Sequence, residues 1–327
     1  MLTFGAVHTG LLQHSAALTP DQVTGLLDLV VGERVRTVTR PLPHAVSPTR
    51  LTGVDCVLPS AAPGTVRVIG TVAGRAAITG GLVLQGSAHT ELDTETRAEG
   101  RKPWSYYLSH PARLEATGRI QPDDVIEGFL AARPRPDTLD VAAVGSRLMD
   151  TVQSSPQLDR QPPFRSSRTT HRWVVRTTEH GSARAVFSIE SPTERSLLLE
   201  IDPEEAAAVP AFCTELALHD WLVTTLSVII DTCLAAPGNR MQRVRRLGPA
   251  VDVLHHLWMP FARIDPELRS LWEALDDRSN LSGQWHASVN RVRDQLTLGV
   301  LTRDQRWSAR KRYPTRSPGS FGSTRPS

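Results

Sequence analysis

The sequence predicts an α+β protein whose N-terminal part is rich in strands and whose C-terminal part ends in helices. Apolar residues alternate with period two in residues 65–92 and again between residues 173 and 201, as in strands with one buried face. From about residue 205 the apolar residues recur at spacings of three and four, which is the period of a helix. The chain is 40% apolar and 22% charged, a composition typical of folded globular proteins.

The N-terminal part begins with a predicted strand over residues 2–7. A helix is predicted to follow from Thr19, because Thr19 can cap it, Pro20 suits its first position and Gln22 can reach back to the cap. Residues 34–39 alternate as in a further strand, which the prolines after them must end. The β region is therefore expected to contain at least one helix.

The strongest strand pattern, residues 65–92, is interrupted by Gly80-Gly81, a pair that suits a tight hairpin turn. Helical patterns return at residues 121–124 and 137–152. We therefore expect a β-rich α+β domain over residues 1–153. Residues 154–168 are polar and rich in proline, as in a linker or a long surface loop.

A second unit is expected over residues 169–302. It is predicted to begin with a three-stranded antiparallel meander, because three alternating segments are separated by short turns. Four helical patterns follow, and two of them open with Asp-Pro-Glu, which supplies a cap, a first-position proline and an acidic first turn. The apolar spacing in residues 244–258 is that of a bundle seam. We expect the meander to pack with a C-terminal helical bundle.

Residues 303–327 differ in composition from the rest of the chain. They hold seven basic residues and one acidic residue, a net charge of +6, whereas the whole chain carries +3. Their content of Arg, Ser, Pro and Gly predicts a disordered tail. Its cluster of Arg310, Lys311 and Arg312 is a candidate for weak nucleic-acid binding, although a solvated extension without a partner is the preferred interpretation.

The sequence lacks the common phosphate-binding and nucleophile motifs. It contains no GxxxxGK[ST], no GxGxxG after a strand and no GxSxG. The three cysteines show no CxxC spacing, which argues against a disulfide framework and against a thiolate zinc site. No cofactor and no metal site is therefore predicted.

The candidate catalytic residues are His219, Asp220 and His255, which lie on two predicted helices and could act as general acids or bases. Glu215 precedes His219 by about one helical turn and could orient its ring. The spacing is not that of HExxH, and histidines beside an apolar helical seam are more often structural. The structural interpretation is the preferred one.

A second candidate is an aromatic segment, in which Trp104, Tyr106 and Tyr107 occupy three of four positions although only 5% of the chain is aromatic. Such a cluster is either a partner-binding patch or an apolar plug that closes the β region.

The apolar run at residues 222–230 is too short to span a bilayer, and the first basic residue is Arg34, which does not fit a signal peptide. A soluble cytoplasmic protein without a membrane partner is expected.

Residues 1–5, 45–56, 216–222, 254–260 and 291–296 together form a pattern that resembles an actinomycete (Streptomyces-type) protein family of unknown function. The resemblance covers about residues 1–300 and leaves out the basic tail. Members of the family resemble components of a gene neighbourhood with a P-loop-like and a methyltransferase-like protein. The resemblance implies an accessory subunit whose partner is another protein, with the P-loop-like protein as one candidate.

These observations predict a non-catalytic interaction or regulatory subunit of an actinobacterial multi-protein system. One alternative is an enzyme with a histidine-based site between the β region and the helices. The other is weak nucleic-acid binding through the tail.

Overall fold

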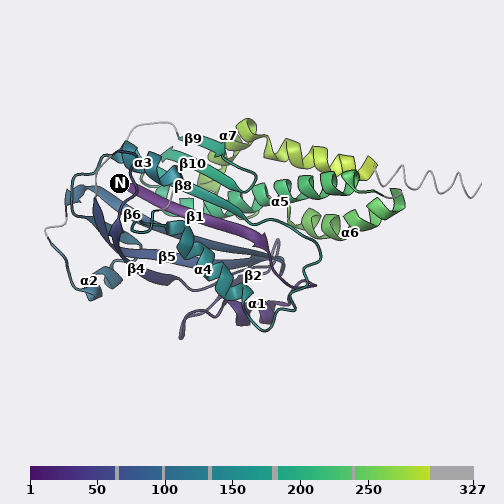
Figure 1. Cartoon of the computed structure of the whole chain (residues 1–327), viewed down its shortest axis with the longest axis horizontal. Coiled ribbons are helices and arrows are strands. Elements are labelled where there is room, and N and C mark those ends of the chain that lie inside the picture. The colour runs from purple at the N-terminus through teal and green to yellow at the C-terminus, as the bar shows by residue number, and fades with distance from the viewer. Residues whose placement is uncertain (63–65, 98–99, 132–134, 179–182, 238–239, 295–327) are drawn as a thin grey trace, which may run out of the picture.

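The computed structural model describes residues 1–62, 66–97, 100–131, 135–178, 183–237 and 240–294. These residues form one mixed sheet of ten strands with helices on both faces, which confirms the α+β class (Figure 1). The strands are β1 (Leu2–Leu11), β2 (Arg36–Val38), β3 (His44–Val46), β4 (Arg50–Val57), β5 (Arg67–Thr79), β6 (Val83–Arg97), β7 (Arg113–Ala116), β8 (Thr169–Thr177), β9 (Arg184–Ile189) and β10 (Glu194–Ile201). The helices are α1 (Pro20–Leu27), α2 (Trp104–Ser109), α3 (Pro122–Leu130), α4 (Val141–Gln153), α5 (Val209–Ala235), α6 (Arg240–Leu257), α7 (Arg269–Ser279) and a last helix over residues 281–294.

Strand β1 lies inside the sheet, and all ten of its residues are buried. It pairs antiparallel with β6 on one side and with β8 on the other. Its side chains alternate between two cores, because Leu2 and Phe4 pack with residues of α3 and α4, whereas Val7 packs with residues of α5. Since β6 precedes and β8 follows residues 154–168, both predicted units contribute strands to the same sheet.

The three strands predicted after residue 169 are present as β8, β9 and β10, but their pairing differs from the predicted antiparallel meander. β8 pairs with β10 in parallel, and β9 pairs antiparallel with β10 at the edge of the sheet. Strand β10 therefore lies between the two strands that precede it. A period-two pattern indicates which side chains of a strand face a core, and it does not specify the neighbouring strand.

Local signals in the N-terminal part are confirmed by the structure. Thr19 caps α1, and the backbone and side chain of Gln22 complete the capping box. Gly80 and Gly81 have φ angles of +60° and +67° in the turn that joins β5 to β6, a left-handed conformation that glycine adopts without strain. These two features, the capping box and the glycine turn, depend only on neighbouring residues, and sequence patterns describe such features best.

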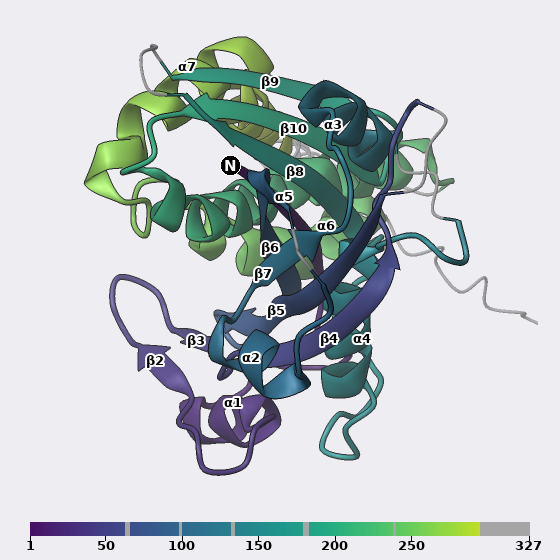
Figure 2. The ribbon, with the colours of Figure 1, turned by 90° about the vertical axis from the view of Figure 1, so that its left-hand side faces the viewer.

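The C-terminal helices pack on the face of the sheet opposite α4 (Figures 1 and 2). Their core includes the buried rings of Trp221, Trp272 and Trp285. In the described part of the chain, one helical segment, Ala206–Cys233, is long and apolar enough to cross a membrane. Most of it is buried inside the protein, as in the core helix of a soluble protein, so it is weak evidence for a membrane span.

Strands β3 and β4 follow each other along one side of β5, and this arrangement creates an edge strand. β3 pairs with the end of β5 and with β2 beyond it, whereas β4 pairs with β5 alone among the described strands. Ser47 lies between the two strands and is hydrogen-bonded to β5. Its N–H donates to the carbonyl of Ala76, and its Oγ accepts from the Ala76 N–H at 2.9 Å. The outer side of β4 is therefore left without a neighbouring strand.

Candidate functional site

The three candidate catalytic residues lie in three different environments. His219 and Asp220 are neighbours on α5 with 1% and 3% of their surface exposed, whereas His255 is exposed on α6. The structure does not bring them together around a common cavity, so their geometry does not support a joint acid-base role.

His219 is enclosed by aromatic rings. Its Nδ1–H donates to the backbone carbonyl of Glu215 at 2.8 Å, and its ring meets those of Trp258 and Trp272 edge-on, with centroids 5.1 and 5.3 Å away. Burial lowers the pKa of His219 to about 4, so the ring is neutral at physiological pH. This arrangement is that of a packing residue.

Asp220 belongs to a buried ionic network that links α5 to two strands. Its carboxylate accepts from Nε2 of His171 at 3.0 Å and from Nε of Arg195 at 3.2 Å. All three side chains are at most 4% exposed. Burial by itself would raise the pKa of Asp220, but the hydrogen bonds and charges of the two partners outweigh it and lower that pKa. The network has no access to a substrate and therefore supports the fold.

The aromatic segment of α2 divides into a buried part and an exposed part. Tyr107 is 2% exposed and its hydroxyl accepts from the N–H of Lys102, whereas Tyr106 donates to Glu115 at 2.9 Å. Trp104 is 40% exposed and lies over Gly53 of β4. Tyr107 is thus part of the core, whereas Trp104 lies partly exposed at the surface.

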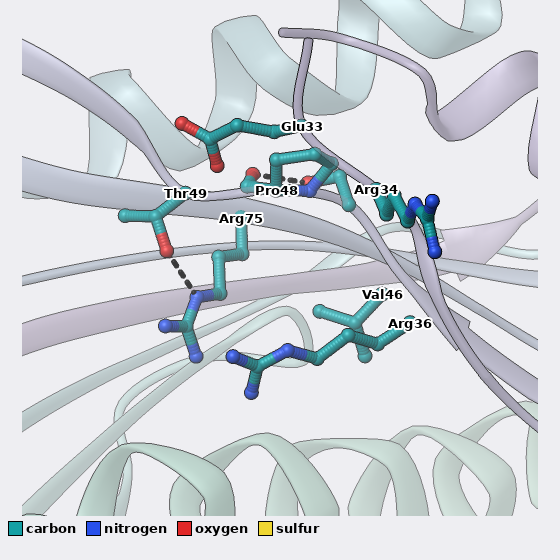
Figure 3. Close-up of a pocket in the computed structure, with 8 residues that line it drawn as sticks. Glu33, Arg34, Arg36, Val46, Pro48, Thr49 and Arg75 are labelled. Carbon is teal, nitrogen blue, oxygen red and sulfur yellow. Dashed lines mark hydrogen bonds between the residues drawn. The ribbon is translucent and has the colours of Figure 1, made fainter.

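A pocket of about 330 Å³ lies where the chain before β2 separates from the start of β4 (Figure 3). We call it the arginine pocket, because Arg34, Arg36 and Arg75 line it together with Glu33, Val46, Ser47, Pro48 and Thr49. Strand pairing explains its position: Arg36 lies opposite Val46 on β3, and Val46 lies opposite Ala77 on β5, two residues from Arg75. Arg36 and Arg75 consequently project from the same face of the sheet.

The guanidinium groups of Arg36 and Arg75 point toward a common space, and Nε of Arg75 donates to Oγ1 of Thr49 at 2.8 Å (Figure 3). No carboxylate of the described residues lies within salt-bridge distance of either guanidinium. Partial burial and the charge of Arg36 together lower the pKa of Arg75. The pocket therefore holds excess positive charge, and Glu33 is its one acidic lining residue.

Comparison with protein-family models, curated proteins and solved structures gave no match. The resemblance to an actinomycete family stays a prediction.

The sequence analysis did not single out the arginine pocket. Arginines are frequent throughout the chain, and Arg36 and Arg75 lie on strands far apart in sequence. The available signal was the alternation in residues 34–39, which places Arg34 and Arg36 on one face of a strand.

Two further predictions concern the basic tail and metal binding. The tail residues Arg310, Lys311 and Arg312 lie outside the described residues. Within the described ranges, no group of three or more His, Cys, Asp or Glu side chains is placed to hold a metal ion. Among the described cavities, the arginine pocket has a chemistry that suits an anion.

Proposed function

We propose that this chain is a non-catalytic interaction subunit that binds an acidic group of a partner protein in the arginine pocket. The observation that carries this proposal is the pair Arg36 and Arg75, which converge without a neutralising carboxylate among the described residues. Both side chains are exposed at the surface, and two like charges placed side by side repel each other. An incoming carboxylate or phosphate relieves that repulsion and gains charge-assisted hydrogen bonds.

The partner is proposed to belong to an actinobacterial multi-protein system in the cytoplasm, and a P-loop-like protein encoded nearby is one candidate. The separate environments of His219, Asp220 and His255 favour binding over catalysis. The free thiols of Cys56 and Cys213 fit a reducing compartment.

The double variant Arg36→Gln/Arg75→Gln is expected to weaken the binding of an acidic probe by about tenfold or more. The reason is that each exposed arginine–carboxylate pair contributes up to about 1 kcal/mol, so the loss of two such pairs amounts to about 2 kcal/mol at most, and a tenfold change corresponds to about 1.4 kcal/mol. The measurement is a fluorescence-anisotropy titration with a labelled ten-residue polyglutamate peptide at low salt.

The matched control is Arg119→Gln/Arg184→Gln, which removes the same charge from two exposed positions away from the pocket. It is expected to change the affinity less than threefold, the residual effect being long-range electrostatics. Equal losses in both double variants would show that polyglutamate responds to net charge alone and would contradict the proposed site.

A further inference from the structure

Within the part of the chain that the structure describes, the outer edge of β4 presents backbone groups that pair with no other strand, directly beside the arginine pocket. The N–H of Leu58 donates toward β5, to the carbonyl of Val66, at 2.8 Å. The N–H and the carbonyl of Val57 point the other way and bond to Asp137 and Leu139 at 2.9 and 2.8 Å. Backbone groups of successive residues in an antiparallel ladder point to alternate sides. The direction of the hydrogen-bonding groups of β4 is thereby established at its C-terminal end.

By the same alternation, the N–H and C=O groups of Leu51, Gly53 and Asp55 point away from β5. Within the described ranges, no strand other than β5 pairs with β4. The outer side is bounded at one end by β2, whose pairing with β3 stops at Arg36, and at the other by the bridge from Val57 to Thr138. The free edge between these limits offers three donor and acceptor pairs at every second residue, the spacing that an added strand requires.

Both faces of the free edge carry surfaces that can receive side chains. On one face Trp104 packs over Gly53, whose missing Cβ would lie 2.9 Å from Cζ3 of the indole, and Trp104 remains 40% exposed. On the other face a groove of about 520 Å³ separates β4 from α4 and is lined by Arg50, Thr52 and Leu148, among others. An added strand would therefore find contacts for its side chains on both faces.

The charges around this edge specify the chemistry of its occupant. Arg34, Arg36 and Arg75 line the arginine pocket at the start of β4, and Arg50 and Arg147 line the groove. The groove also contains Asp150, but that carboxylate already pairs with Arg168 at 2.7 Å. The complementary segment is acidic, whereas the last 25 residues of this chain carry a net charge of +6 and do not match.

We propose that β4 is the docking site for an extended acidic segment of a partner protein, which adds to the sheet as a strand and places carboxylates in the arginine pocket. The backbone hydrogen bonds at Leu51, Gly53 and Asp55 supply the affinity, and Trp104 and the groove select the side chains. The acidic end of the segment lies at the Thr49 end of β4. This inference rests on the proposed function for that end and adds the mode of binding.

The test uses ten-residue fluorescent peptides of alternating valine and threonine with three glutamates at one end, made with the glutamates at either terminus. Each is also made with methyl groups on alternate backbone nitrogens, and with lysines in place of the glutamates. The protein variants are Leu51→Pro, which removes an outward N–H at a position where an edge strand tolerates proline, and Leu51→Ala, which keeps that N–H.

We expect one acidic peptide to bind the native protein, to bind Leu51→Pro at least tenfold more weakly, and to bind Leu51→Ala within threefold of native. We expect its backbone-methylated form and the lysine peptide not to bind. If Leu51→Pro does not fold, the methylated peptide tests the same hydrogen bonds on the native chain.

Other results would overturn the inference in distinguishable ways. Binding that is lost in Arg36→Gln/Arg75→Gln but insensitive to Leu51→Pro and to backbone methylation rejects strand addition and leaves the proposed function intact. Binding that is insensitive to the arginine substitutions, to Leu51→Pro and to backbone methylation rejects both strand addition and the proposed function. A native dimer that Leu51→Pro converts to a monomer would assign the edge to a second copy of this chain.

Discussion

Replacing Asp220 by alanine is expected to lower the free energy of unfolding by about 3–5 kcal/mol, the cost of breaking a buried ion pair. Arg195 is 4% exposed, and its remaining N–H groups bond to the carbonyl of Ser191 at 2.6 Å and to Thr224 at 3.1 Å. Without Asp220 its guanidinium would stay buried with neutral acceptors only. His171 would lose the acceptor of its Nε2–H at the same time.

The measurement is chemical denaturation followed by tryptophan fluorescence. Asp231→Ala is the matched control, because Asp231 lies on the same helix and pairs with Arg291 at 3.0 Å, with side chains 66% and 55% exposed. An exposed pair contributes about 1 kcal/mol or less. If the two variants lost similar amounts of stability, the buried network would not be a determinant of this fold.

The free energy of unfolding is also expected to fall steeply as the pH is lowered from about 6.5 to about 4. Burial lowers the pKa of His219 and His89 to about 4 and that of His44 to about 3, and nearby arginines act in the same direction. In the unfolded chain these rings bind protons near pH 6.5. Protons therefore favour the unfolded state throughout this window, and the stability present above pH 6.5 is lost as the pH falls.

Each such histidine contributes up to about 1.4 kcal/mol per pH unit to the slope of the free energy of unfolding against pH. For His219 this amounts to about 3 kcal/mol between pH 6.5 and its folded-state pKa of about 4. Glu215 acts in the opposite sense, because burial raises its pKa despite the charge of Arg263. Comparison between variants isolates the contribution of one histidine. His219→Gln should reduce the slope of the free energy of unfolding against pH, between pH 4.5 and 6, by close to the contribution of one bound proton.

His256→Gln provides the control, since it makes the same substitution at an exposed position of α6. Denaturation curves at half-unit pH intervals give the slopes directly. A slope that does not differ between native protein and His219→Gln would mean that the ring takes up its proton without unfolding.

Sequence patterns described the candidate site in part. Asp220 was singled out as an acid-base candidate, but its partners His171 and Arg195 were not, because they lie on strands that the predicted pairing placed differently. The aromatic segment around Trp104 was identified, while the packing of Trp104 over Gly53 of a distant strand was not. Side chains that meet across a sheet leave no regular spacing in the sequence.

The sequence by itself determined the features that depend on neighbouring residues: the capping box at Thr19, the left-handed turn at Gly80-Gly81 and the periods that distinguish strands from helices. The energy of each feature comes from contacts between residues that are close in sequence, so its residue pattern can be recognised in the sequence. Tertiary structure alone decided that β8 lies parallel to β10, that β4 is an edge among the described strands, and that Arg36 and Arg75 face the same pocket. Those outcomes depend on which strands pair. The pairing depends in turn on how much apolar surface the complete sheet buries.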